Sequence, residues 1–181
     1  MVYDIIEKIY KRLFQNYMRR KVSYLSEGDK KKFLVETGVK IHNKNVFVGS
    51  NVKFYHNVII FGDGPVVIDN GSIIGYNTII YSSKNGGVYI GKQCAIAANT
   101  YIIDTNHSTH ELKHSIQEAD VSKKVEIGDR VWIAAQCVIG KGAKLNDNVI
   151  VGANSFVNRE FPCNAIIAGT PASIVKYRSN N

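Results

Sequence analysis

Large aliphatic residues recur at every sixth position over much of this chain. The clearest stretch, residues 127–156, divides into five six-residue units that open on Ile127, Ile133, Ile139, Leu145 and Val151. A period of six fits neither an α-helix, whose period is 3.6, nor an ordinary strand, whose period is 2. A repeated hexapeptide is typical of a parallel β-helix, in which each unit is one short strand followed by a turn. We therefore predict an all-β solenoid whose aliphatic side chains point inward.

Small or turn-forming residues follow the inward positions. In the same five units the second place is taken by Gly128, Ala134, Gly140, Asn146 and Gly152. Residues of these types allow a chain to turn tightly. We expect the backbone to turn at this place of each unit.

The repeat is interrupted at three places. Its phase begins near Val48 and continues to Ile102, with short turn-rich insertions around residues 62–65 and 83–87. The largest break separates Ile102 from Ile127 and predicts a loop over residues 108–126. Long loops in compact domains are usually functional or disordered, so this one is the first place to look for chemistry.

The chain before the repeat has a different pattern. Residues 4–21 predict an amphipathic helix with one apolar stripe, made of Ile5, Ile6, Ile9, Tyr10, Leu13, Phe14 and Tyr17. We favour packing of this helix on the body of the protein or on a sister subunit. A helix lying on an anionic membrane surface is the alternative. The expected division is an N-terminal helix and basic cap at 1–45, the β-helix at 46–160 and a C-terminal cap and tail at 161–181.

Charge and cysteine content limit the expected partners and cellular location of the protein. Of the net charge of +8, residues 1–44 supply +6, with eleven Lys/Arg against five Asp/Glu. No basic face with stacking aromatic residues is recognisable, so no nucleic-acid partner is expected. The three cysteines have no metal-knuckle or disulfide spacing, and neither a secretory signal nor a membrane-spanning run is present. We expect a cytoplasmic protein, with contact to the inner face of the membrane as the alternative that residues 4–21 leave open.

The best candidate for chemistry is the run from Asp104 to His107, where the largest loop leaves the repeat. Histidine is the side chain best suited to general-base work near neutral pH. A nearby carboxylate can hold the imidazole in one tautomer, and Asp104 is the nearest in sequence. A hydrogen-bonded turn histidine is the structural alternative.

Several motifs resemble one known family. Four features are similar to the hexapeptide-repeat acyltransferases: the hexads, the run Asn106-His107-Ser108-Thr109-His110-Glu111-Leu112, the segment Val131-Trp132-Ile133 and the ending Ala168-Gly169-Thr170-Pro171-Ala172. The nearest branches are the maltose/galactoside acetyltransferases and the sugar O-acetyltransferases of polysaccharide biosynthesis. The resemblance covers about residues 48–178. It does not cover the helical domain that precedes the coil in maltose acetyltransferases, so acceptor contacts from that domain are not transferred.

The resemblance implies a left-handed β-helix assembled as a homotrimer, with acetyl-CoA between neighbouring subunits. It implies direct transfer of acetyl to a sugar hydroxyl, with His107 as general base and no metal. Asn77 matches a family asparagine beside the reacting group. The positions that match the acetyl-CoA site are Trp132, Ala135 and Ala153 along the pantetheine arm, and Asn158, Arg159 and Lys176 near the adenine and phosphates.

Other interpretations remain open on the sequence. An N-acetyltransferase acting on a nucleotide-linked amino sugar would use the same base and donor. A zinc hydratase of the γ-carbonic-anhydrase type would use three histidines, and His107, His110 and His114 are near one another in sequence. Their clustering in one loop, together with Trp132, favours the transferase. A non-catalytic solenoid is the third class.

Overall fold

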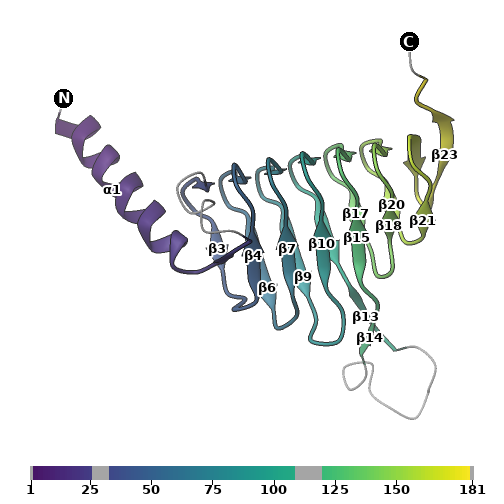
Figure 1. Cartoon of the computed structure of the whole chain (residues 1–181), viewed down its shortest axis with the longest axis horizontal. Helices are drawn as coiled ribbons and strands as arrows, with labels where there is room; N and C mark the ends of the chain where they lie inside the picture. The colour runs from purple at the N-terminus through teal and green to yellow at the C-terminus, as the bar shows by residue number, and fades with distance from the viewer. Residues whose placement is uncertain (1, 26–32, 109–119, 180–181) are drawn as a thin grey trace.

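The computed structural model describes residues 2–25, 33–108 and 120–179, which form a parallel β-helix preceded by one α-helix (Figure 1). The coil is left-handed, as the resemblance implied. Three ladders of short parallel strands, here called sheets A, B and C, make its three sides. Successive strands along the chain pass from A to B to C, so each round of three strands is one coil.

The elements are brief, as a hexapeptide repeat requires. The helix is α1 (Val2–Arg19). Sheet A contains β1 (Ser23–Tyr24), β4 (Val46–Val48), β7 (Val66–Ile68), β10 (Val88–Ile90), β15 (Val125–Ile127), β18 (Lys144–Leu145) and β21 (Glu160–Phe161). Sheet B contains β2 (Leu34–Val35), β5 (Lys53–Phe54), β8 (Ile73–Ile74), β11 (Ala95–Ile96), β16 (Trp132–Ile133), β19 (Ile150–Val151), β22 (Ala165–Gly169) and β23 (Ala172–Tyr177). Sheet C contains β3 (Lys40–Ile41), β6 (Ile59–Gly62), β9 (Ile79–Ser82), β12 (Tyr101–Ile103), β17 (Val138–Ile139) and β20 (Phe156–Val157).

The predicted inward positions form the core. Equivalent residues of successive coils are paired in register, as Ile74, Ile96 and Ile133 are in sheet B. Each is at most 2% exposed. The neighbouring strand residue points outward in every case, because side chains alternate along a strand. The hexad therefore fixes both the fold and the face of each strand.

The turns lie later in each unit than we expected. Left-handed backbone conformation falls on the third residue after the inward aliphatic, at Arg130, Gln136, Gly142, Asn148 and Asn154. Asparagine tolerates this conformation and glycine has no Cβ to clash. The second place is small for another reason. A Cβ on Gly128 would lie 2.5 Å from Asp147 Oδ1 of the next coil, so the coils approach too closely there for a larger side chain.

All three interruptions leave the coil at the corner between sheets C and A. The first two join β6 to β7 and β9 to β10. The third contains two strands outside the coil, β13 (Thr105–His107) and β14 (Asp120–Ser122), which pair antiparallel. The predicted loop at 108–126 therefore begins and ends as an ordered hairpin, and the chain is back in sheet A at Val125.

The coil extends further than residues 46–160. In the N-terminal cap, β2 and β3 pair with β5 and β6. At the other end, β22 continues sheet B, and β23 folds back antiparallel against it. This hairpin covers the last coil, which limits the open edge that a solenoid would otherwise expose.

The N-terminal helix forms, but it does not pack along the β-helix. Figure 1 shows α1 standing away from the coil, which it meets at its C-terminal end. There Met18 is buried and Phe14 is half-buried against the core. The stripe residues Ile6 and Leu13 are 59% and 63% exposed. The expectation that the helix packs on the β-helix of its own chain is therefore wrong for most of its length. A sister subunit and a membrane surface are the two partners that the sequence analysis leaves for the exposed stripe. Within the part of the chain that the structure describes, no helix has the length and hydropathy to cross a bilayer.

The alternation in β8 gives a matched test of the fold. Ile74 is fully buried and Ile73, the residue before it, is half-buried on the outer face. We expect Ile74→Ala to lower the free energy of unfolding by about 2–5 kcal/mol, because it leaves a cavity in the core. Ile73→Ala should cost roughly 1 kcal/mol or less. Urea unfolding of both variants checks this, and equal losses would contradict the inward assignment.

Candidate active site

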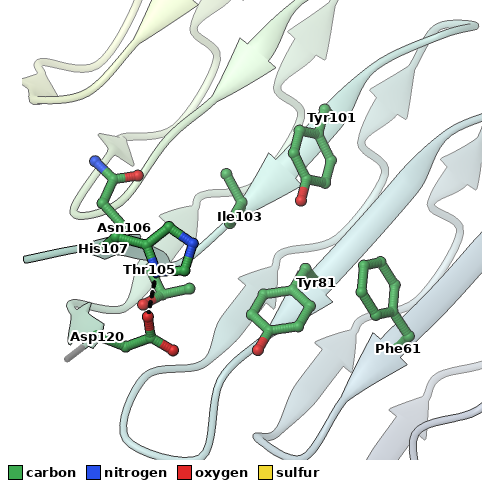
Figure 2. A pocket seen from close by; sticks show the side chains of 8 residues that line it. All are labelled: Phe61, Tyr81, Tyr101, Ile103, Thr105, Asn106, His107 and Asp120. Atoms are coloured by element: carbon green, nitrogen blue, oxygen red, sulfur yellow. Dashed lines mark ion pairs between the residues drawn. The ribbon is translucent and has the colours of Figure 1, made fainter. Parts of the chain in front are cut away.

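His107 lies at the end of β13, opposite Asp120 on β14. Its Nδ1 is 2.9 Å from Asp120 Oδ1 (Figure 2). Directly opposed residues of an antiparallel pair have adjacent side chains, so the hairpin register itself sets this contact. A carboxylate at Nδ1 holds the ring in one orientation and directs the other ring nitrogen, Nε2, to a proton-transfer partner. The orienting carboxylate is Asp120, which the sequence analysis did not single out.

Asp104, a candidate whose orientation toward His107 the sequence left open, does not face that histidine. Its side chain is fully buried at the base of the hairpin. The carboxylate accepts hydrogen bonds from the backbone N–H of Ser83 at 2.9 Å and of Gly87 at 2.5 Å, and from the Ser82 hydroxyl at 3.2 Å. Ser83 and Gly87 belong to the insertion between β9 and β10, and Ser82 is the last residue of β9. Asp104 therefore links the insertion between β9 and β10 to the hairpin of β13 and β14. Both of its carboxylate oxygens accept hydrogen bonds from that insertion or from β9.

The base of the hairpin is tied down by further contacts. Ser122 donates from its hydroxyl to Thr105 Oγ1 at 3.1 Å, and Ser83 donates to Ser122 Oγ at 2.8 Å. The Lys123 N–H donates to the Asp104 carbonyl at 2.8 Å. The position of His107 is therefore fixed through the same network that holds the preceding insertion.

A pocket of about 470 Å³ opens beside His107 on the outer face of sheet C. Figure 2 shows its walls, with Phe61, Tyr81 and Tyr101 along the sheet and His107 with Asp120 at one end. Phe61 and Tyr81 meet edge to face, with ring centroids 4.8 Å apart. Burial raises the pKa of Tyr81 and the pKa of Tyr101, and nearby acidic groups add to the rise at Tyr81. Both phenols are therefore neutral near pH 7 and can donate hydrogen bonds.

A second pocket, of about 380 Å³, continues along sheet C toward the C-terminus. It shares Tyr101, Ile103 and Asn106 with the first pocket, so the two adjoin at β12 and at the residue before His107. Its far end is lined by Lys141 and Asn158. Asn158 was a predicted donor-site residue, whereas Lys141 was missed because an isolated lysine in the repeat gives no signal.

Three other predicted residues lie at the corner between sheets B and C. Asn77 is between β8 and β9, Ala135 between β16 and β17, and Ala153 between β19 and β20. Asn77 has a left-handed backbone conformation, with φ of 55°. Its side chain accepts from Asn57 at 3.2 Å and donates to Asn99 at 3.1 Å. It is thus a member of a ladder of corner amides, and it does not line the His107 pocket of its own chain.

The remaining predicted residues are also distant from that pocket. Trp132 lies on the outer face of sheet B and is 51% exposed. Arg159 follows β20, donates to the Ala172 carbonyl at 2.9 Å and covers the ring of Phe161. Lys176 is exposed on β23. A single chain therefore brings Asn158 close to the histidine region, whereas Trp132, Ala135 and Ala153 lie on another side or corner of the coil.

The described chain holds two buried thiols, Cys94 and Cys137, and one exposed thiol, Cys163. Burial raises the pKa of the Cys94 thiol to about 11 and also raises the pKa of Cys137, so both thiols are protonated near neutral pH. No group of three His, Cys, Asp or Glu side chains within residues 2–25, 33–108 and 120–179 is arranged to hold a metal ion. His110 and His114, which the zinc interpretation needs, lie outside the described residues.

Comparison with known proteins places these features among transferases. Residues 124–159 match the family model "Bacterial transferase hexapeptide (six repeats)", and residues 65–103 match "Hexapeptide repeat of succinyl-transferase". WbbJ of Escherichia coli (strain K12), a provisionally named lipopolysaccharide biosynthesis O-acetyl transferase, is 30% identical over 68% of this chain and 62% of its own length. Galactoside O-acetyltransferase of the same organism is 28% identical over 85% of this chain and 71% of its length. The chain thus spans about two thirds of these relatives.

A solved structure agrees with the fold. AntD, an N-acyltransferase from Bacillus cereus determined in complex with dTDP and 3-hydroxybutyryl-CoA, superposes with a TM-score of 0.76. The match covers 91% of this chain and 88% of AntD at 20% sequence identity. At that identity the likeness supports the β-helix and not the substrate.

The two aspartates near the histidine should respond differently to substitution. Asp104→Ala leaves the buried N–H groups of Ser83 and Gly87 without their acceptor, so we expect a loss of roughly 2–5 kcal/mol in the free energy of unfolding. Asp120→Ala removes a half-exposed carboxylate and should cost about 0.5 kcal/mol or less. Denaturant unfolding separates the two roles, and a larger loss for Asp120→Ala would contradict them.

Proposed function

Because this chain belongs to the hexapeptide-repeat transferase family, we propose that it moves an acetyl group from acetyl-CoA to a hydroxyl of a sugar or surface-glycan precursor. The observation that carries the proposal is the His107–Asp120 pair in a pocket that adjoins a second pocket. Both E. coli relatives carry the name of an O-acetyl transferase, in the case of WbbJ a provisional one, which supports a hydroxyl acceptor. N-acetylation of an amino sugar would use the same groups and is the variant to be tested beside it.

The two adjoining pockets suit two substrates. We assign the pocket that ends at Lys141 and Asn158 to acetyl-CoA, because a cation there matches the phosphates of the donor. The pocket walled by Phe61 and Tyr81 then receives the acceptor. Aromatic walls with a few polar groups are usual in sites for organic ligands. The reacting hydroxyl and the thioester would meet beside His107.

Transfer then needs only one base. His107 Nε2 takes the proton of the acceptor hydroxyl as its oxygen attacks the thioester carbonyl carbon. Asp120 stabilises the imidazolium that forms. Collapse of the tetrahedral intermediate breaks the carbon–sulfur bond, and the departing CoA thiolate receives the proton from His107. No acyl-enzyme is formed, which agrees with the protonated state of the buried thiols of Cys94 and Cys137.

A homotrimer would complete the site. The outer face of sheet C is largely apolar from β6 to β20, through Ile59, Phe61, Ile79, Tyr81, Tyr101, Ile103, Val138 and Phe156. The outer face of sheet A mixes charged residues such as Glu126 and Lys144 with the aromatic residues Phe47 and Tyr89. We propose that a second copy of the chain packs on sheet C of the first copy. The part of the second copy that makes this contact is the corner between its own sheets B and C. Its Ala135 and Ala153 would then flank the pantetheine arm, with Asn77 near the thioester and Trp132 alongside.

The role of His107 is tested by His107→Ala. We expect acetyl transfer to fall by about 10²–10⁴-fold, the usual range for loss of a general base, with acetyl-CoA affinity nearly unchanged. Steady-state assays of CoA release with sugars, nucleotide sugars and glycan oligomers measure the first quantity, and calorimetry measures the second.

Two controls sharpen this test. His42→Ala changes an exposed histidine of the N-terminal coils and should leave turnover unchanged. Asp120→Ala should lower turnover less than His107→Ala does, because it removes the orienting carboxylate and keeps the base. Full turnover in His107→Ala would reject the assignment, and one tightly bound zinc per subunit in metal analysis would reject the reaction.

Arg159 and Lys176, the phosphate contacts that the family resemblance implies, lie outside the pocket that ends at Lys141 and have a test of their own. Arg159→Ala with Lys176→Ala should weaken acetyl-CoA binding by roughly tenfold or more, because exposed cations that meet phosphates contribute charge-assisted hydrogen bonds. Lys92→Ala, at an exposed corner between sheets A and B, is the matched control and should bind normally. Wild-type affinity in the double variant, by isothermal titration calorimetry, would refute the phosphate role.

A further inference from the structure

The N-terminal helix carries an apolar stripe that nothing in the described chain covers. Its members, each more than half exposed, are Ile5, Ile6, Ile9, Tyr10, Leu13 and Tyr17. They recur at spacings of three and four, so they form one continuous band along α1. Soluble monomers rarely expose a contiguous apolar band of this kind unless it is used for binding.

The helix is anchored at one end only. Met18 and Phe14 pack on the first coils, and the Gln15 side-chain amide donates to the Val35 carbonyl. The Tyr24 hydroxyl also donates to the Arg19 carbonyl, at 3.1 Å. The preceding turns stand clear of the coil in Figure 1. The stripe is therefore held at a fixed place on the molecule while its apolar face stays open.

Basic residues adjoin the stripe. Lys8 and Arg12 follow Ile5 and Ile9 by three positions, which places them along one edge of the band. Arg20 and Lys21 continue beyond the helix, and the Lys21 ammonium lies 5.4 Å from the centre of the Tyr17 ring. Residues 1–44 hold six of the eight net positive charges. Tyrosines within such a band suit the boundary between headgroups and acyl chains, where a ring has an apolar body and a polar tip.

We propose that α1 lies on an anionic lipid bilayer, with its stripe in the acyl boundary and its basic edge at the phosphate headgroups. Two features favour a bilayer over a second copy of the helix. Packing the helices of two copies directly on one another would bring the basic residues of both segments 1–44 together, whereas anionic headgroups neutralise them. The band is also wide, because Ile5 and Tyr10 mark opposite edges, which suits a flat lipid surface better than the narrow seam of a helix pair.

Co-sedimentation with lipid vesicles tests the proposal on the full chain. One set of vesicles is pure phosphatidylcholine, and the other contains phosphatidylglycerol as the anionic lipid. We expect binding to the anionic vesicles that weakens as salt increases, and little binding to the neutral ones. Ile9→Gln with Leu13→Gln should abolish binding to both. Lys8→Gln with Arg12→Gln should lower anionic-vesicle binding by roughly 25-fold, since each basic residue near such a surface contributes about fivefold.

A control variant and two further measurements distinguish lipid binding from contact between copies of the chain. Val175→Gln replaces an aliphatic side chain that is also 63% exposed but lies on β23, and it should bind vesicles like the wild type. Glutamine is a good helix former, and circular dichroism verifies that α1 persists in the variants. Failure of the wild type to bind, or unchanged binding by the Ile9/Leu13 variant, would overturn the proposal. A fall in oligomer mass in that variant by light scattering, without vesicle binding by the wild type, would assign the stripe to contact between copies instead.

Discussion

Hydrogen bonding between successive coils is the constraint on which the rest of this structure depends. Each strand residue donates to the coil beside it, as Trp132 does to Val149 at 3.0 Å and Ala95 to Val131 at 2.9 Å. The ladder holds only if every coil returns to the same register. The inward aliphatic residues and the left-handed corners enforce that return once in every six residues. An extra residue within a side would turn the inward side chains outward, so additional chain must leave at a corner.

That constraint also locates the chemistry. All three insertions leave at the corner between sheets C and A, where they are stacked on one another. Asp104 joins the second insertion to the third through buried hydrogen bonds. Loss of a buried acceptor lowers the stability of the fold, because its donors are left unpaired. The hairpin that results carries His107 and Asp120 beyond the coil, next to the outer face of sheet C. A rigid rod thus presents a base on a short, well-anchored projection.

The sequence was sufficient for the features that repeat and insufficient for those that depend on one hairpin. Ile127, Ile133 and Ile139 gave the period, and their burial follows from it. The turn position was misplaced because glycine in the second place of the hexad reflects close contact between coils, as at Gly128, and not a left-handed backbone. Asp120 was missed because it is thirteen residues from His107 and becomes its neighbour only through antiparallel pairing. Asp104 was chosen for its proximity in sequence, which says nothing about the direction of a side chain at a strand end.

The central claim is that one active site is shared by two copies, with His107 from one and the corner containing Ala153 from the next. Subunit mixing tests it most directly. His107→Ala lacks the base, and Ala153→Tyr, at an exposed corner, would obstruct the pantetheine arm. Co-expressed in equal amounts, the two inactive variants should regain about a quarter of wild-type acetyl transfer, because random assembly of a cyclic oligomer leaves that share of interfaces intact. Activity no higher than that of the separate variants would contradict a shared site.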